Sequence, residues 1–446
     1  MKIIIAGAGE VGFHLARLLA TESHDITLID TQYEKLDYAR NHLDVMTLKG
    51  DSTSFKILKD ARIGEADLLI AVTSAGDTNI TTCLIGKKLG AKKTIARIRN
   101  MEYLVDKSIL DFKTMGIDEL ISPESLAARE IKRLLKESAV TDSFEFEDGK
   151  LSFLGLQIDE NAPLIGKTLA ETAYLNPDND FIIAAIHRDG ETIIPRGKTR
   201  FQLNDHAYFI AQSGGMDNIL NFAGKKRIQI KNIMILGGSR TGIHAARRLS
   251  SQYNIKLIEI NKEKSFELAD ELPEVLVING DGTNAELLEE EGINQMDAFI
   301  AVTGNSETNI LSCLVAKNRG VAKTIAMVEN IEYINLSHNI GLDTMINKKL
   351  IAANFIFRYI RKGEVISLTG INGVDAEILE FKVPAGSKVT TKPIKDLDFP
   401  KSAIIGGVIR DEVGYITLGE FRIIPNDRVV VFSLSKCIHD VEKFFR

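Results

Sequence analysis

The chain has 446 residues, of which 44% are hydrophobic and 26% charged, an ordinary composition for a folded protein with several apolar cores. Its formal net charge of −6 argues against a general nucleic-acid binder. Three cysteines without a Cys-x-x-Cys pair argue against a disulfide framework and a structural zinc site. There is no run of ~18 apolar residues that could span a membrane, and Met1-Lys2 leads directly into a strand-like segment, so we expect no signal peptide and a cytoplasmic protein.

The N-terminal part of the chain alternates short apolar strands with amphipathic helices. A helical pattern covers Val11–Ala20, and a second helix is expected over Pro123–Leu135, with proline in its first turn. Fully apolar strands between helices predict a parallel sheet that is covered on both faces. The predicted strands are Lys2–Ala6, Ile26–Ile29, Val45–Leu48, Leu68–Val72 and Thr94–Ile98.

The segments 142–215 and 363–445 follow a different pattern, with short strands, turn residues and little long helix. In the first of them, Asp189-Gly190 predicts a hairpin turn. The two segments also match each other in sequence. Corresponding residues are Arg188 with Arg410 and Asp205 with Asp427.

Almost every feature of the chain occurs twice, about 230 positions apart, and the offset is 230 for Gly7 and Gly237 and for Cys83 and Cys313. A repeat of this length indicates duplication of whole domains. The predicted organisation is A–B–A′–B′, in which each half has a doubly wound α/β domain followed by a small α+β domain, and Ala223–Arg227 forms a solvated linker between the halves. The predicted domains are residues 1–138, 139–224, 228–362 and 363–446.

A glycine fingerprint lies between the first strand and the first helix. Gly7 allows a tight turn, Gly9 lets the backbone approach a pyrophosphate, and Gly12 lets the helix pack on the strand. The N-terminus of that helix offers free N–H groups to phosphates. The alternative is a glycine-rich turn without a ligand.

An acidic residue follows the second strand in each half, Asp30 in the first and Glu259 in the second. A carboxylate here can accept both ribose hydroxyls of an adenosine and would repel a 2′-phosphate, which favours NAD(H) or an adenine nucleotide over NADP(H). The alternative for Asp30 is that it only caps a turn.

Two further pairs of residues lie at strand ends near the expected ligand. Asp51 and Asp281 can reach the adenine edge or only N-cap the helix that follows. Thr73 and Thr303 lie where the strand order should reverse, so they can contact ribose or phosphate or be plain strand-end hydroxyls.

The two halves are not equivalent. Ser239 replaces the second glycine of the fingerprint and puts a side chain where phosphates must come close. Arg97 is available to phosphates in the first half, whereas its counterpart is Met327. Arg97 and Arg99 share one face of the fifth strand by their spacing. We therefore expect the first site to bind the tighter or more highly charged ligand; alternatively, Arg97 pairs with a carboxylate at a subunit contact.

Over essentially the whole chain, this order of motifs resembles the TrkA family, the cytosolic regulatory subunits of bacterial Trk potassium-uptake systems. The resemblance implies Rossmann-like RCK (KTN) domains, binding of NAD(H) and ATP/ADP, and assembly of dimers or tetramers into a ring. It also implies docking on a TrkH- or TrkG-type potassium-conducting membrane protein, at the inner face of the cell membrane. The ligand contacts that it implies are Gly7, Ala8, Gly9, Glu10, Val11, Asp30, Thr73, Ser74 and Arg97, and, in the second half, Gly238, Ser239, Arg240, Thr241, Gly242, Glu259 and Thr303.

Three functions compete. The first is a ligand-sensing regulator without catalysis. The second is an NAD-dependent dehydrogenase, which needs a proton-transferring residue near the nicotinamide, and the short B segments offer no obvious candidate. The third is a structural scaffold with vestigial sites.

Overall fold

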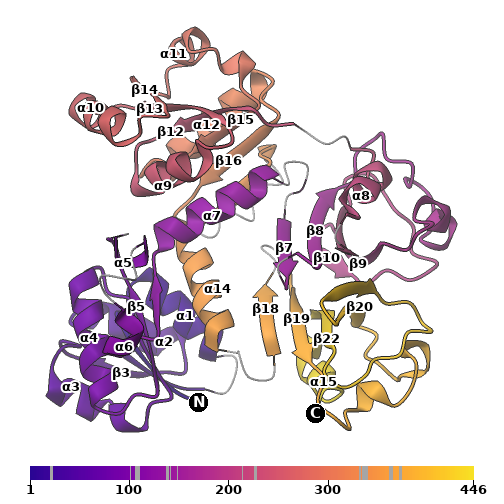
Figure 1. The fold of residues 1–446 in the computed structure, drawn as a ribbon, viewed down its shortest axis with the longest axis horizontal. Coiled ribbons are helices and arrows are strands. Elements are labelled where there is room, and N and C mark those ends of the chain that lie inside the picture. Colours follow the sequence, from indigo (N-terminus) through magenta and orange to yellow (C-terminus); the bar gives the residue numbers. More distant parts are fainter. Residues whose placement is uncertain are drawn as a thin grey trace. The chain divides into compact units, whose positions relative to one another are not determined.

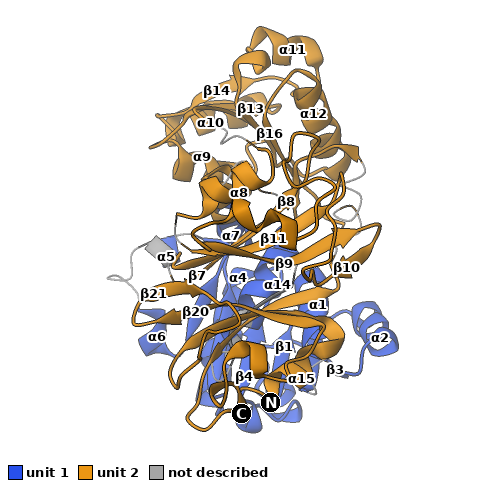
Figure 2. Ribbon diagram, turned by 90° about the vertical axis from the view of Figure 1, so that its right-hand side faces the viewer, with its two compact units in different colours: residues 1–128, 347–360 blue, residues 129–346, 361–446 orange. Residues whose placement is uncertain are grey.

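The computed structural model describes residues 1–20, 24–100, 102–105, 111–136, 140, 142–147, 149–212, 214–225, 229–330, 333, 340–360, 365–370 and 374–446. The chain forms two compact units, coloured separately in Figure 2: Met1–Ala128 with Asn347–Ile360, and Arg129–Ile346 with Arg361–Arg446. Lys226 and Arg227 of the expected linker, and the predicted domain boundaries at 138/139 and 362/363, lie outside the described residues. The four-domain division therefore stays a prediction.

The first unit is built on a six-stranded sheet with the order β3-β2-β1-β4-β5-β6, in which all neighbouring strands are parallel (Figure 1). Ile3–Ala6 are all buried, as expected for a strand with both faces covered. The predicted doubly wound parallel sheet is thus confirmed, and its order reverses between β1 and β4. The strands are β1 (Lys2–Ala6), β2 (Asp25–Asp30), β3 (Met46–Lys49), β4 (Leu68–Ala71), β5 (Lys93–Arg97) and β6 (Glu119–Ile121).

The helices of this unit follow the strands, and the first of them begins at the glycine turn, one residue earlier than predicted. Their bounds are α1 (Glu10–Ala20), α2 (Tyr33–His42), α3 (Phe55–Asp60), α4 (Gly76–Lys88), α5 (Glu102–Val105) and α6 (Phe112–Met115). Helix α7 (Pro123–Lys136) begins in this unit, which includes its residues up to Ala128. One more helix, α14 (Lys348–Ile360), belongs to the second half of the sequence but packs against α1 in this unit (Figures 1 and 2).

The second unit contains the repeat of this sheet, with the order β14-β13-β12-β15-β16-β17. Its parallel register reproduces that of the first sheet, as the duplication predicts. The strands are β12 (Asn232–Leu236), β13 (Asn254–Glu259), β14 (Leu276–Asn279), β15 (Ala298–Ala301), β16 (Lys323–Met327) and β17 (Thr344–Ile346). The helices are α9 (Arg240–Leu249), α10 (Lys262–Glu271), α11 (Ala285–Glu290) and α12 (Ser306–Asn318).

Two five-stranded antiparallel sheets make up the rest of the second unit, with the orders β10-β9-β11-β8-β7 and β18-β19-β22-β20-β21. They pack on each other: Phe153, Tyr208 and Ile210 of one share a buried cluster with Ile378 and Phe432 of the other. The two B segments thus form a common core. The strands are β7 (Asp142–Phe146), β8 (Leu151–Gln157), β9 (Phe181–Arg188), β10 (Glu191–Ile193), β11 (His206–Gln212), β18 (Val365–Gly370), β19 (Ala376–Lys382), β20 (Ala403–Arg410), β21 (Val413–Ile416) and β22 (Arg428–Leu434), with the helices α8 (Met216–Phe222) and α15 (Ile438–Glu442).

The sequence match between the B segments has a structural cause. Arg188 donates from Nε and NH2 to the buried carboxylate of Asp205, both at 2.6 Å, and Arg410 binds Asp427 in the same way at 2.8 Å. A bidentate guanidinium–carboxylate pair fixes the relative orientation of the two side chains and also pairs their charges. The predicted hairpin at Asp189-Gly190 is confirmed, since both residues have positive φ between β9 and β10.

In the part of the chain that the structure describes, no helix is both long and apolar enough to cross a membrane.

Candidate functional site

The glycine turn after β1 is set by backbone geometry. Gly7 has φ +107°, and a Cβ there would lie 2.8 Å from the backbone N of Thr73. A Cβ on Gly12 would lie 1.8 Å from the carbonyl oxygen of Gly7, so α1 can approach the turn only with glycine at this position. Gly9, by contrast, has nothing within 4 Å of the place of its Cβ, which leaves open space above the turn.

Asp30 lies beside this turn at the end of β2. Its Oδ2 accepts a hydrogen bond from the backbone N of Ala8 at 2.8 Å, and its Oδ1 accepts one from the backbone N of Gln32 at 2.9 Å. These two bonds fix the carboxylate at the mouth of the turn. It therefore does hold a turn, as the alternative stated, and it also faces the space where a ligand would lie.

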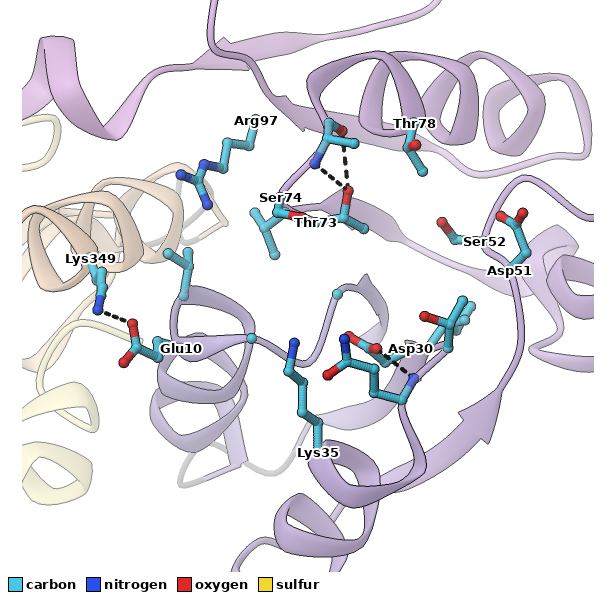
Figure 3. A pocket seen from close by; sticks show the side chains of 18 of the residues that line it. Glu10, Asp30, Lys35, Asp51, Ser52, Thr73, Ser74, Thr78, Arg97 and Lys349 are labelled. Atoms are coloured by element: carbon cyan, nitrogen blue, oxygen red, sulfur yellow. Dashed lines mark hydrogen bonds and ion pairs between the residues drawn. The ribbon is translucent and has the colours of Figure 1, made fainter. Parts of the chain in front are cut away.

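A cavity of about 610 Å³ opens over the turn, at the point where the strand order of the first sheet reverses (Figure 3). Its volume falls in the range of small-molecule sites, and the position is where ligands bind in open α/β sheets. The predicted site residues that line it are Gly7, Gly9, Glu10, Val11, Asp30, Asp51, Thr73, Ser74 and Arg97. Of the predicted set in the first half, Ala8 and Gly12 do not line it: Ala8 is buried and binds Asp30 through its backbone, and Gly12 packs against Gly7.

The structure excludes one of the two interpretations of Asp51, and its contact with the adenine edge stays a prediction. The N-cap of α3 is Ser54, so the capping alternative for Asp51 is wrong. Asp51 Oδ1 instead accepts from the backbone N and the hydroxyl of Thr53, at 2.9 and 2.8 Å, and these bonds lower the pKa of the Asp51 carboxyl. The carboxylate closes its own turn and lines the cavity.

Thr73 is held by Asn79 on α4. Asn79 Oδ1 accepts from the backbone N and the hydroxyl of Thr73, at 2.9 and 2.7 Å. Its amide nitrogen donates to the carbonyl oxygens of Thr73 and Arg97, at 3.1 and 2.9 Å. One fully buried amide therefore ties together the ends of β4 and β5, which both face the cavity.

Arg97 lines the cavity and lies close to a carboxylate of its own unit. Its NH2 is 3.7 Å from Oε1 of Glu124 at the start of α7. This carboxylate belongs to the same chain, so the pairing of Arg97 at a subunit contact stays a prediction. Arg99 lies two residues beyond the end of β5 and is exposed, whereas Arg97 is half-buried, and the shared face of the two arginines stays a prediction.

Sequence reasoning missed several residues of this site. The hydroxyl and basic residues among them are Thr31, Ser52, Thr78, Lys35, Lys348 and Lys349. Lys35 follows Asp30 by five positions and could have been found from local sequence. The two lysines of α14 come from the other half of the chain, and no local pattern indicates them.

The turn of the second half is packed differently from that of the first. A Cβ on Gly238 would lie 2.3 Å from Leu268 Cδ1 and 2.7 Å from Glu259 Oε2. Leu268 occupies the position of Ala39 in the first half, so a larger side chain fills the region under the turn. Ser239 is the N-cap of α9: its hydroxyl accepts from the backbone N of Gly242 at 3.3 Å and donates to the carbonyl oxygen of Val302 at 2.6 Å.

Glu259 is also engaged by protein groups. It accepts from the backbone N of Gly238 at 3.1 Å and of Asn261 at 2.9 Å, and Lys264 lies 3.0 Å from its Oε2. Burial alone would raise the pKa of Glu259, but these hydrogen bonds and the ammonium group lower it below its ordinary value. The side chain that was predicted to bind ribose is surrounded by protein donors.

The other predicted residues of the second half keep the positions of their counterparts. Gly237 has φ +103°, and Asn309 binds Thr303 as Asn79 binds Thr73. Asp281 accepts from Thr283 within its own turn. Arg240 is exposed at the start of α9, whereas the next residue, Thr241, is buried.

Comparisons with known proteins agree with this architecture. The TrkA-N domain family matches residues 3–123 and 233–348, and the TrkA-C domain family matches residues 154–224 and 378–446. The "Trk system potassium uptake protein TrkA homolog 2" of Methanosarcina mazei is 33% identical over 455 residues, with both chains covered completely. A TrkA homolog of Archaeoglobus fulgidus is 34% identical over 447 residues, again over the whole of both chains.

Among solved structures, the crystal structure of the GsuK RCK domain aligns with a TM-score of 0.61 at 17% identity, covering 100% of this chain and 94% of that one. A structure of the GsuK channel bound to NAD aligns with a TM-score of 0.60, covering 100% of this chain and 78% of that one. At this identity the likeness concerns the fold. With both domain families present twice and full-length relatives above 30% identity, the chain belongs to the TrkA family of Trk-system potassium-uptake proteins.

Proposed function

We propose that this protein is a nucleotide-sensing regulatory subunit, which binds NAD(H), ATP or ADP in its first half and gates a membrane potassium-uptake protein of the TrkH or TrkG type. The observation that carries the proposal is the cavity of about 610 Å³ over the glycine turn, with Asp30 fixed at its mouth. Membership of the TrkA family supports the link to potassium uptake.

The cavity offers each part of an adenine nucleotide a chemically matched group. The N-terminus of α1 and the open space above Gly9 suit phosphates. Asp30 suits the two ribose hydroxyls, and its charge disfavours a 2′-phosphate. We assign Thr73, Ser74 and Arg97 to further contacts with ribose and phosphate.

A regulator without catalysis accounts for the lining better than a dehydrogenase does. Hydride transfer to a carbonyl normally needs a proton donor beside the nicotinamide. Among the described residues that line the cavity there is no histidine, cysteine or tyrosine, and the carboxylates of Asp30 and Asp51 are held by backbone donors. The remaining proton carriers of the lining are lysines and Glu10, and because Lys349 and Glu10 pair with each other, we propose binding without turnover.

Regulation requires that the ligand prefer one arrangement of the protein over another. A difference of ~1–3 kcal/mol in binding free energy between two arrangements is enough for a useful response. In our proposal, subunits assemble into a ring at the inner face of the membrane, and the ring passes this preference to the potassium-conducting partner.

The first test is calorimetric titration of the full chain with NADH, NAD, ATP and ADP. We expect Asp30→Ala to weaken binding by roughly tenfold to a hundredfold, because it removes charge-assisted hydrogen bonds to ribose worth about 1.5–3 kcal/mol. Glu259→Ala is the matched control and should leave the affinity unchanged, since Glu259 does not line the cavity of the first half.

Three outcomes would contradict parts of the proposal. Unchanged affinity in Asp30→Ala would favour a scaffold with vestigial sites. Oxidation of NADH with a panel of carbonyl substrates would revive the dehydrogenase. Potassium flux through a reconstituted TrkH-type partner that does not respond to any of the four nucleotides would remove the gating role.

A further inference from the structure

Helix α14 comes from the second half of the sequence, where it follows β17, yet it belongs to the first unit. It packs against α1, the helix that begins at the glycine turn. Near its other end, Lys93 of β5 lies with Nζ 5.9 Å from the ring centroid of Tyr359. The first two residues of the helix, Lys348 and Lys349, line the cavity.

Lys349 is held at the end of this cavity where α1 begins. Its side chain is 13% exposed and pairs with the carboxylate of Glu10, the first residue of α1 (Figure 3). Glu10 itself is 71% exposed, so a phosphate can replace it as the partner of the lysine at little cost. In the same view, Lys349 and Arg97 lie toward one side of the cavity, and Asp30 and Asp51 lie toward the other.

The position of these lysines is unfavourable for the helix by itself. Cations in the first turn of a helix oppose its dipole, and α14 has no acidic residue there. The equivalent helix of the first half, α7, has Glu124 at the position of Lys349. A charge that conflicts with local helix preference and faces a cavity indicates a functional requirement.

We propose that Lys349 binds the phosphates of the nucleotide in the first half, so that a residue of the second half senses the phosphate charge of the ligand. The proposal rests on the function proposed above and adds a specificity-determining residue to that site. When a nucleotide binds, its phosphate oxygens replace the Glu10 carboxylate at the Lys349 ammonium group. Ligands with more phosphate charge gain more from this exchange, whereas adenosine gains nothing.

The exchange also couples the ligand to α14. Lys349 can reach the phosphates only while α14 is packed on α1, so phosphate binding stabilises that packing and the packing in turn raises the affinity for phosphate. Adenosine, which carries no phosphate, should leave the packing unaffected.

The test is calorimetric titration of the full chain with ATP and ADP, together with adenosine measured by competition. Lys349→Gln should lower the affinity for ATP and ADP by roughly tenfold, as expected for loss of a charge-assisted hydrogen bond. The affinity for adenosine should stay within about twofold of that of the unmodified chain. Lys349→Arg should retain most of the preference for ATP. Lys59→Gln, which replaces an exposed lysine of α3 outside the cavity, is the matched control and should behave like the unmodified chain.

Glu10→Gln provides an independent arm. Removing the competing carboxylate should raise the affinity for ATP a few-fold. In a chain that already carries Lys349→Gln, the same change should leave the affinity for ATP unaltered. Hydrogen exchange of the α14 amides should slow on addition of ATP in the unmodified chain and not in Lys349→Gln.

The possible failures are distinguishable. If the unmodified chain binds none of these ligands, the proposed function itself is wrong. If it binds ATP and Lys349→Gln binds ATP equally well, only the role of Lys349 is overturned. An equal loss of affinity for ATP and for adenosine in Lys349→Gln would also overturn the role of Lys349, because a merely structural role predicts that pattern.

Discussion

His14 lies on the buried side of α1, two residues beyond the glycine turn, and its environment disfavours charge. Arg17 donates from NH2 to His14 Nδ1 at 2.9 Å, so the ring proton lies on Nε2, which is buried without a hydrogen-bond partner. Burial, with a smaller effect of the Arg17 charge, lowers the pKa of His14 from 6.5 to about 4.

This histidine makes the stability of the first unit depend on pH. Between about pH 6.5 and 4 the unfolded chain binds a proton at His14 and the folded chain does not, so the stabilisation is complete above pH 6.5 and is lost as the pH falls through 4. The loss amounts to about 3 kcal/mol. We expect the urea midpoint of the first unit to fall less between pH 7.5 and 4.5 in His14→Gln than in the unmodified chain. His439→Gln, at an exposed site of α15, is the control. If the urea midpoint depended on pH equally in His14→Gln and in the unmodified chain, His14 would not be the group responsible.

At the scale of secondary-structure elements, the site depends on how strand ends are joined. Asn79 and Asn309 each link the ends of two neighbouring parallel strands, and both are buried. In each case the side-chain oxygen accepts two hydrogen bonds and the nitrogen donates two. The duplication has kept this link in both halves, which indicates that it serves the fold as well as the site.

Replacing either asparagine by aspartate should destabilise its own unit. The carboxylate cannot donate, so two buried carbonyl oxygens lose their partner and face a negative charge, at a cost of about 2–3 kcal/mol. We expect Asn79→Asp also to weaken nucleotide binding, because Thr73 and Arg97 shift, whereas Asn309→Asp leaves binding unchanged. Thermal unfolding and calorimetry on both variants check this, and equal loss of affinity in the two would be inconsistent with a site confined to the first half.

At the scale of the whole molecule, the two halves share a fold but differ at the turn. Gly9 leaves open space in the first half, whereas Ser239 caps its own helix and Leu268 fills the region under the turn in the second. The same scaffold therefore carries different side chains at the turn in its two halves. Sequence reasoning expected the first site to bind the tighter or more highly charged ligand, because of Ser239 and because Met327 replaces Arg97, and this expectation stays a prediction until binding is measured.

We expect one adenine nucleotide per chain. Calorimetric stoichiometry checks this directly, and a value of two in the unmodified chain would show that the packed turn opens for a ligand. In a variant with both Ser239→Gly and Leu268→Ala, the turn regains space and a free N–H at Gly242, so a second, weaker binding event should appear. The same variant should lose about 2–5 kcal/mol of stability in the second unit, since Leu268 is buried.

How much of the fold could be predicted depended on the length of each pattern. The apolar strands β1, β2 and β4 were found within one or two residues, because a strand covered on both faces needs an unbroken apolar run. The three-residue strand β6 escaped, since so short a segment carries no periodicity. The common core of the two small sheets was not predicted either, because the alternation of apolar and polar residues along a strand does not show which surface packs against its apolar face.

By itself, the sequence determined the duplication, the doubly wound sheets and the residues around the glycine turn, because each of these follows from local rules on glycine conformation, strand burial and spacing. Only the tertiary structure decided which chain segments complete the site. Glu124 beside Arg97, Lys349 beside Glu10, and Leu268 under Gly238 are contacts between residues that lie far apart in the sequence. Such contacts depend on how helices pack against sheets, and a pattern read along one segment holds no information about its distant neighbour.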